Sequence, residues 1–284
     1  MIPREDLLRV RRLASRVNPR IKDWAGLGDR GNRDRLGLTL AEGAKLVREG
    51  LASSSAGMFR PAALLVSDAG ASREEAGELF AAAGALGVER YSLSDDCYAK
   101  VAELKNSDGL GLLLSFSREP ADIDELLTRP ESKWLAAAGV QDPGNAGALA
   151  RTALAAGAAG CLFIGGADPT SPKFLRGGMG AAFRLPCLSV DEEEFASIVT
   201  RTGVRMVTAE SGPEASDYRR VDYSSPMILL VGGERGVPER LAALASERAH
   251  IPLAGGVESL NLAVAAGIIL FEANRNWSSS ENVP

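Results

Sequence analysis

Three short segments in the second half of the chain are apolar at every position, and segments with helical periodicity separate them. They are "WLAAAGV" at 134–140, "CLFIGG" at 161–166 and "MILLVGG" at 227–233. A strand that is apolar throughout is buried on both faces, which is typical of a parallel sheet covered by helices on both sides. We therefore predict an α/β fold with a mostly parallel sheet for this half.

The first half shows a similar alternation on a smaller scale. Apolar strands are predicted at "AALLVSD", "VERYSLS" and "GLGLLLSFS", and helices at "REEAGELFAAAGALG" and "DDCYAKVAEL". The polar stretch "REPADIDELLTRPESK" then separates two regions of different composition. With 284 residues, 45% of them hydrophobic, two cores are expected. We predict a small α/β domain with a basic N-terminal segment at 1–117, a linker at 118–132 and a second domain at 133–284.

The charge is distributed unevenly along the chain. Residues 1–60 carry 13 Lys and Arg against 7 Asp and Glu, a balance of +6, although the net charge of the whole chain is −5. The segment "REDLLRVRRLASRVNPRIKDW" resembles a helix rich in arginine, which fits either contacts with phosphates or a solvated helix face. The sequence contains no apolar run long enough to cross a bilayer, so we expect a soluble, cytoplasmic protein.

The cysteines and the single histidine give little support to metal or thiol chemistry. Cys97, Cys161 and Cys187 are far apart and form no CxxC pair, so we interpret them as buried thiols. His250, in an expected strand "HIPL", is interpreted as structural. We predict no metal site.

In an open α/β sheet the ligand binds at the carboxyl ends of the strands, where three loops stand out. In "VQDPGNAGALARTALAAGA", at 140–158, Asn145 is predicted to cap a helix that is otherwise nearly all small or apolar. Arg151 in that helix must reach solvent or an anion.

The second loop, "LLVGGERGVPERL" at 229–241, has glycines that allow close approach of the backbone to a ligand, and one carboxylate at Glu234. The third, "GGVESLNLAVAAGIILFE" at 255–272, places Ser259 and Asn261 at the start of an apolar helix. Helix capping by Ser259 is a purely structural alternative.

Together these loops resemble the three motifs of the SpoU/TrmH family of RNA ribose 2′-O-methyltransferases, in the SPOUT class. "DPGNAGALART", "GGERGVP" and "IPLAGGVESLNLAVAAGIILFE" correspond to the first, second and third motifs, and "SPKFLRGGMGAAFRLP" to the segment that connects the first two. The second motif is one residue shorter than the common form. More loosely, "NPRIKDW", "AEGAKLVREGL" and "KNSDGLGLLLSF" look like the small α/β domain with which members hold RNA.

The resemblance implies a trefoil-knotted catalytic domain that binds S-adenosylmethionine, works as a homodimer and methylates rRNA or tRNA. It implies a catalytic set of Arg151, Asn145, Glu234, Ser259 and Asn261. The implied cofactor-binding set is Leu230, Gly232, Gly233, Ile251 and Leu260. Candidates for phosphate contacts are Arg20, Lys22, Lys45, Lys173 and Arg176.

The family pattern gives Arg151 the task of helping the ribose hydroxyl lose its proton. A guanidinium stays protonated in proteins, so we expect Arg151 to clamp a phosphate beside the target ribose, and the proton to leave to phosphate, water or Glu234.

Two alternatives remain open at this point. One is a protein that binds RNA but has lost catalysis. The other is a nucleotide-dependent oxidoreductase. It would require the glycine fingerprint of a dinucleotide-binding site, but the loop after "WLAAAGV" in this sequence lacks the third glycine.

Overall fold

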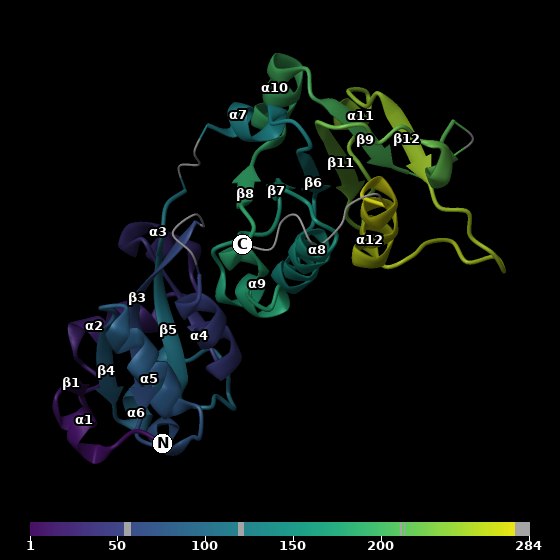
Figure 1. The fold of residues 1–284 in the computed structure, drawn as a ribbon. Helices are drawn as coiled ribbons and strands as arrows, with labels where there is room; N and C mark the ends of the chain where they lie inside the picture. The colour runs from purple at the N-terminus through teal and green to yellow at the C-terminus, as the bar shows by residue number, and fades with distance from the viewer. Residues whose placement is uncertain (54–57, 119–121, 211, 213, 276–284) are drawn as a thin grey trace. The chain divides into compact units, whose positions relative to one another are not determined.

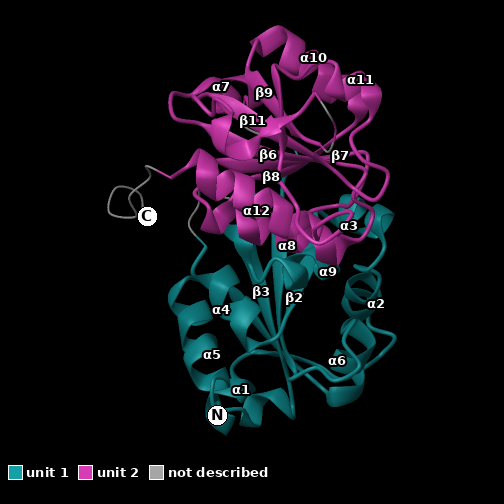
Figure 2. Cartoon of the chain, turned by 90° about the vertical axis from the view of Figure 1, so that its right-hand side faces the viewer, with its two compact units in different colours: residues 1–118, 170–184 teal, residues 119–169, 185–284 magenta. Residues whose placement is uncertain are grey.

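The computed structural model describes residues 1–53, 58–118, 122–210, 212 and 214–275 (Figure 1). The chain forms two compact units (Figure 2). Unit 1 contains Met1–Arg118 and Thr170–Arg184, and unit 2 contains Glu119–Pro169 and Leu185–Pro284. Residues 170–184 therefore belong to unit 1, although in the chain they lie between two strands of unit 2.

Unit 1 is built on a five-stranded mixed sheet with the order β1-β4-β3-β5-β2. The strands are β1 (Arg11–Leu13), β2 (Leu38–Glu42), β3 (Phe59–Ser67), β4 (Glu89–Leu93) and β5 (Leu110–Phe116). β1, β4 and β3 run parallel, whereas β5 pairs antiparallel with both β3 and β2. The three apolar strands predicted in the first half of the sequence are β3, β4 and β5.

Helices cover both faces of this sheet. They are α1 (Arg4–Leu8), α2 (Pro19–Ala25), α3 (Arg30–Leu36), α4 (Ala44–Leu51), α5 (Ala76–Ala85), α6 (Asp95–Val101) and α9 (Pro172–Gly177), with 3₁₀ turns η1 (Gly70–Ser72) and η2 (Ala181–Phe183). Trp24 of α2, Cys97 of α6 and Leu65 of β3 belong to one buried cluster. The helices expected at 73–87 and 95–104 correspond to α5 and α6.

The basic N-terminal segment is not one helix, so that prediction was wrong. Helix α1 ends at Leu8, β1 pairs in parallel with β4, and α2 begins at Pro19. Proline fits the first turn of a helix but breaks its interior, and Asn18 accepts a hydrogen bond from the Arg20 amide as the cap. The pairing of β1 with a strand some 80 residues away overrides the local helical pattern.

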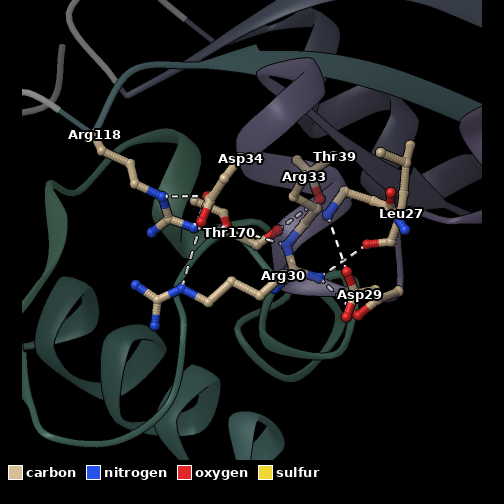
Figure 3. A network of polar contacts seen from close by, with 10 residues as sticks. Leu27, Asp29, Arg30, Arg33, Asp34, Thr39, Arg118 and Thr170 are labelled. Atoms are coloured by element: carbon tan, nitrogen blue, oxygen red, sulfur yellow. Dashed lines mark hydrogen bonds and ion pairs between the residues drawn. The ribbon is translucent and has the colours of Figure 1, made fainter.

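A buried polar network holds residues 170–184 to the rest of unit 1 (Figure 3). The Arg33 guanidinium, only 2% exposed, donates to the carbonyls of Leu27 and Gly28 at 2.9 and 2.8 Å, and to Thr170 Oγ1 at 3.2 Å. Thr39 Oγ1 donates to the Thr170 carbonyl at 2.6 Å. Since a buried cation is stable only with partners, Arg33 and Thr170 depend on each other.

Thr170→Val should destabilise unit 1 by about 1–3 kcal/mol, because the hydroxyl that accepts hydrogen bonds from Arg33 and Arg118 is removed while the side-chain shape stays nearly constant. Urea unfolding would measure the change. Thr128→Val, at an exposed site in unit 2, is the matched control and should change stability by at most about 0.5 kcal/mol. A loss at Thr170 no larger than in the control would contradict the role of the network.

Unit 2 is built on a seven-stranded sheet with the order β10-β12-β9-β11-β6-β7-β8. The strands are β6 (Lys133–Ala138), β7 (Gly160–Ile164), β8 (Cys187–Val190), β9 (Arg205–Ala209), β10 (Ser216–Asp217), β11 (Met227–Gly232) and β12 (Glu247–His250). Every neighbouring pair within the described part of this sheet is parallel. The predicted α/β class and mostly parallel sheet are thus confirmed.

Two layers of helices enclose this sheet. The helices are α7 (Ile123–Thr128), α8 (Pro143–Ala155), α10 (Glu192–Thr202), α11 (Glu239–Ala242) and α12 (Leu262–Ala273), with the 3₁₀ turn η3 (Tyr218–Arg220). α8 and α12 pack together on one side, and α7 and α10 lie on the other (Figures 1 and 2). Helix α7 falls within the stretch expected to be a linker, and its Asp124 forms an ion pair with Arg201 of α10.

Two boundaries in unit 2 differ from those expected. The helix predicted at "PERLAALASER" ends at Ala242, and residues 247–250 form β12, so "HIPL" is the end of a strand and the start of a loop. His250 Nδ1 lies 2.9 Å from the carbonyl oxygen of Ala215, in line with a structural role. All three cysteines are buried as predicted, and burial raises the pKa of the Cys161 thiol.

Candidate active site

The three loops singled out in the sequence follow β6, β11 and β12. Because all strands of this sheet are parallel, the three loops leave from the same edge. β6 and β11 are direct neighbours in the sheet, and β9 lies between β11 and β12. The sheet order thus brings together loops that are about 90 and 20 residues apart in sequence.

The first two loops touch through backbone. The Gly233 amide donates to the carbonyl of Ala138, the last residue of β6, at 2.8 Å, which extends the β6–β11 pairing by one residue past the end of β11. A Cβ built at Gly233 would lie 2.8 Å from the Gly139 carbonyl oxygen, so any side chain there would push the loops apart. Glycine at 233 is therefore required for this contact.

The second loop closes on itself as a tight turn. Gly233 and Gly236 form a β-bridge, and the Gly236 amide donates to the Gly233 carbonyl at 2.9 Å. A Cβ at Gly232 would lie only 2.1 Å from the carbonyl carbon of Gly236 and 2.3 Å from the Val237 amide nitrogen. Glu234 is exposed at the tip of the turn.

The first loop leads into α8 with Asp142 as its cap, so the prediction that Asn145 caps this helix was wrong. The Asp142 carboxylate accepts a hydrogen bond from the Asn145 amide at 3.0 Å, and Pro143 occupies the first helical turn. The side chain of Asn145 is thereby left exposed and available. The signal in the sequence was the Asp-Pro pair, typical of a cap followed by the first helical residue.

Arg151 projects to solvent from the third turn of α8. Within the residues that the structure describes, its guanidinium makes no hydrogen bond or ion pair. The neighbouring Ala150 and Thr152 are buried and half-buried, so the helix itself is packed on both sides of this position. A guanidinium that is held on a packed helix, and that has no partner among the described residues, is suited to binding an anion.

The third loop, residues 251–261, ends where Asn261 caps α12. The Asn261 side chain accepts hydrogen bonds from the amides of Ala263 and Val264 at 3.0 and 3.3 Å. Ser259 does not cap α12, so helix capping, the purely structural role considered for Ser259, is not observed. Between Pro252 and Ser259 every residue is exposed, and Ile251 and Leu260 are half-buried.

The catalytic candidates all lie in unit 2, but among the residues that the structure describes no hydrogen bond joins one of these side chains to another. Asn145 and Arg151 share α8, six residues apart, and Glu234 lies on the adjoining loop. Among the cofactor candidates, Leu230 is fully buried in β11, and Gly232 and Gly233 form the turn described above. At this edge of the sheet, a half-buried glycine turn thus follows a fully buried apolar strand.

The five candidates for phosphate contacts all lie in unit 1. Arg20 already has protein partners: it donates to the Tyr91 hydroxyl, stacks 5.3 Å over that ring and lies 3.8 Å from Glu89. Lys22 and Lys45 are exposed, and neither has a charged partner within the described residues. Lys173 is exposed at the start of α9.

Arg176 is engaged with two carboxylates. Its guanidinium lies 3.1 Å from Glu103 and 3.6 Å from the fully buried side chain of Glu42. Burial raises the pKa of the Glu42 carboxyl, and the amide of Glu103 and the charge of Arg176 oppose this rise. No local pattern indicated these pairs, because Arg176 is more than 70 residues from either partner. Arg176 therefore holds α9 on unit 1.

Within the described ranges, no group of three or more His, Cys, Asp or Glu residues could hold a metal ion. The same residues include no helix that is long and apolar enough to span a bilayer.

Comparison with known proteins relates both units to one class of enzyme. Residues 133–271 match the SpoU rRNA Methylase family, and residues 18–111 match an MRM3-like substrate binding domain. The chain is 30% identical over 264 residues to the 23S rRNA (guanosine(2553)-2′-O)-methyltransferase RlmP of Bacillus subtilis, covering 92% of this chain and 98% of that protein. This chain belongs to the SpoU methylase family. The resemblance seen in the three loops is confirmed.

Two further proteins extend this comparison. An AdoMet-bound rRNA methyltransferase from Sinorhizobium meliloti superposes with a TM-score of 0.80 at 31% identity, over 95% of this chain and 99% of that one. A tRNA (guanosine(18)-2′-O)-methyltransferase of Thermus thermophilus is 36% identical, but only over 141 residues, 48% of this chain and 71% of that protein. Of these three proteins, the two named for rRNA therefore align along nearly the whole chain, and the one named for tRNA aligns along about half of it.

Proposed function

We propose that this chain transfers a methyl group from S-adenosylmethionine to a ribose 2′-hydroxyl of structured RNA. The observation that carries the proposal is the edge of the unit 2 sheet, where the first and second loops touch through Gly139 and Gly233. The first loop leads into α8, whose Arg151 makes no hydrogen bond or ion pair within the described residues. The nucleotide-dependent oxidoreductase is excluded by membership of the SpoU family.

The cofactor would be held largely by backbone. The turn at 232–237 has no room for a Cβ at Gly232, so its main-chain groups can come into direct contact with a ligand. Ile251 and Leu260, both half-buried, supply apolar surface suited to an adenine ring, whereas the side chain of Leu230 is fully buried and the residue could contribute only through its backbone. When bound, S-adenosylmethionine supplies an activated methyl group, so the protein needs no covalent catalysis.

The chain's own task is to orient the ribose and to remove its proton. We assign Arg151 to a phosphate next to the target ribose, where a guanidinium aligns the sugar and lowers the pKa of its hydroxyl. The proton passes to phosphate, water or Glu234, which is exposed on the adjoining loop. Asn145, Ser259 and Asn261 would orient the arginine and the sugar by hydrogen bonds.

Homodimerisation and a knotted catalytic domain belong to the same proposal. Val264 and Phe271 are seven residues apart in α12, so both lie on one face of the helix, and they are 51% and 55% exposed. Leu253 and Val257 in the preceding loop are apolar and exposed as well. Large apolar side chains in such an arrangement favour burial against a second copy of unit 2.

Ribosomal RNA is the proposed substrate class, and the cytoplasm the proposed location. The relative named for 23S rRNA aligns along nearly the whole chain, including unit 1, whereas the one named for tRNA aligns over about half of it. In this proposal unit 1 recognises the bases and the shape of the RNA. A relative that is similar through unit 1 as well as unit 2 therefore tells more about the substrate than one that is similar over half of the chain. Lys22, Lys45 and Lys173 are the candidates for phosphate contacts there, and Arg20 and Arg176 could contribute after exchanging partners.

Mass-spectrometric mapping of ribose methylation in cells with and without the gene would test the function. We expect one 2′-O-methyl mark in rRNA to be lost and then restored on complementation. Loss of a mark in tRNA would overturn the proposed substrate class. Calorimetry of the purified protein should show binding of S-adenosylmethionine; if it shows none, and no mark is lost, the catalytically inactive RNA-binding alternative is favoured.

A further inference from the structure

Helices α8 and α12 carry two of the three loops of the proposed site, and one glycine sets the spacing between them. α8 bears Asn145 and Arg151, and α12 follows directly from the loop that ends at Asn261. At the crossing, a Cβ built on Gly267 would lie 2.9 Å from Thr152 Cγ2. Carbon atoms pack best about 3.5–4.0 Å apart, so a side chain at 267 does not fit without movement.

The methyl group of Thr152 cannot easily turn away. Thr152 Oγ1 donates to the Ala148 carbonyl at 2.9 Å, and a β-branched side chain in a helix has few rotamers. Cγ2 is thereby held toward Gly267. The residue that faces Gly267 is also the immediate neighbour of Arg151, so a shift of Thr152 moves the backbone that carries the arginine.

The C-terminal end of α12 is anchored, so the helix cannot simply slide away. Lys133 Nζ at the start of β6 donates to the Ala273 carbonyl at 2.6 Å, and Asn274 Nδ2 donates to the Ala156 carbonyl at 2.7 Å. The N-terminal half of α12 has no such side-chain bond to the rest of the sheet among the described residues. Strain at Gly267 would thus be relieved by tilting this half, with Asn261 and the third loop.

We propose that Gly267 is a positioning residue that, through Thr152, sets the distance between Arg151 and the loop at 251–261. This inference rests on the proposed function of that site. An alanine at 267 would separate the helices by roughly 0.6–1 Å, the difference between 2.9 Å and an ordinary contact. Misplacement on this scale is sufficient to slow a reaction that depends on alignment.

The test compares Gly267→Ala, Thr152→Ser and the double variant. Serine lacks Cγ2 but keeps the hydroxyl that bonds to Ala148, so it removes the steric contact alone. We expect kcat in Gly267→Ala to fall at least about 10-fold, while RNA binding through unit 1 changes less than about 2-fold. The double variant should regain most of the lost kcat, and Thr152→Ser alone should lower kcat less than Gly267→Ala does, because it loosens this contact instead of forcing the helices apart.

Gly84→Ala in α5 is the matched control, because its Cβ would meet only the movable end of Arg90. All assays are run well below the unfolding temperature of each variant. A kcat in Gly267→Ala equal to the control, or a loss that Thr152→Ser does not restore, would overturn the inference. Should Gly267→Ala not fold, the double variant, which lacks Cγ2, should recover the fold, and a double variant that also fails to fold would count equally against the inference.

Calorimetry with S-adenosylmethionine, together with the methylation assay, distinguishes a failure of the proposed function from a failure of the role inferred for Gly267. Absence of binding and of methylation in the unmodified protein would contradict the proposed function itself. Normal binding and turnover in the unmodified protein, with no effect of Gly267→Ala, would contradict only the role of Gly267.

Discussion

Replacement of Arg151 by alanine should reduce kcat by roughly 10²- to 10³-fold, the cost typical of removing one preorganised donor from a transition state. The reason is that Arg151 is exposed, unpaired within the described residues and held on the packed helix α8. Its removal leaves an RNA phosphate without its cation. Because its guanidinium makes no hydrogen bond or ion pair within the described residues, the free energy of unfolding of the variant should differ by at most about 0.5 kcal/mol from that of the unmodified chain.

Arg151→Lys distinguishes a phosphate clamp from other roles for this residue. Lysine supplies the charge without the planar fork, so we expect activity between that of the arginine and that of the alanine variant. Steady-state kinetics with the RNA substrate would measure this. Equal losses in the lysine and alanine variants would contradict the clamp, and thermal unfolding provides the control for folding.

Gly232→Ala should weaken the binding of S-adenosylmethionine by roughly 10- to 100-fold, because overpacking costs about 1–3 kcal/mol and each 1.4 kcal/mol is tenfold in affinity. The new Cβ would meet backbone atoms of Gly236 and Val237 at 2.1–2.4 Å, and backbone cannot rotate away as a side chain can. The turn at 232–237 must open, and with it the contact between the first two loops.

Gly203→Asn is a suitable control for this change. Gly203 ends α10 in the left-handed region at φ 62°, with nothing near its Cβ position, and asparagine tolerates that conformation. Calorimetry should therefore give an affinity close to that of the unmodified protein. Tight cofactor binding by Gly232→Ala would show that this turn does not contact the ligand.

The strands of both sheets could be predicted wherever a segment was apolar throughout, as in β6, β7 and β11, because burial on both faces leaves a local signal. β1 could not, since "RRL" carries two arginines and forms a strand only by pairing with β4. Similarly, the cap of α8 was misassigned by three positions, to Asn145 instead of Asp142, and α12 is capped by Asn261 and not by the alternative Ser259. Asp, Asn and Ser are all good caps, and local sequence alone does not choose among them.

The candidate site shows the same division between local and long-range information. The glycines at 232 and 233 were recognised by their clustering, and their close backbone contacts now explain why no side chain fits there. The attachment of residues 170–184 to unit 1 left no trace in the sequence, because Arg33 and Thr170 are 137 residues apart. For the same reason Arg176 was predicted as a candidate for phosphate contacts without any sign of its ion pairs with Glu42 and Glu103.

Hydrogen–deuterium exchange with and without S-adenosylmethionine would test most directly whether the loops after β6, β11 and β12 enclose one ligand. We expect the amides of 139–145, 232–237 and 251–261 to be protected together, at the same cofactor concentration, with the sheet of unit 1 unchanged. Protection of only one of these loops, or of none while the cofactor is bound, would contradict a shared site at this edge of the sheet.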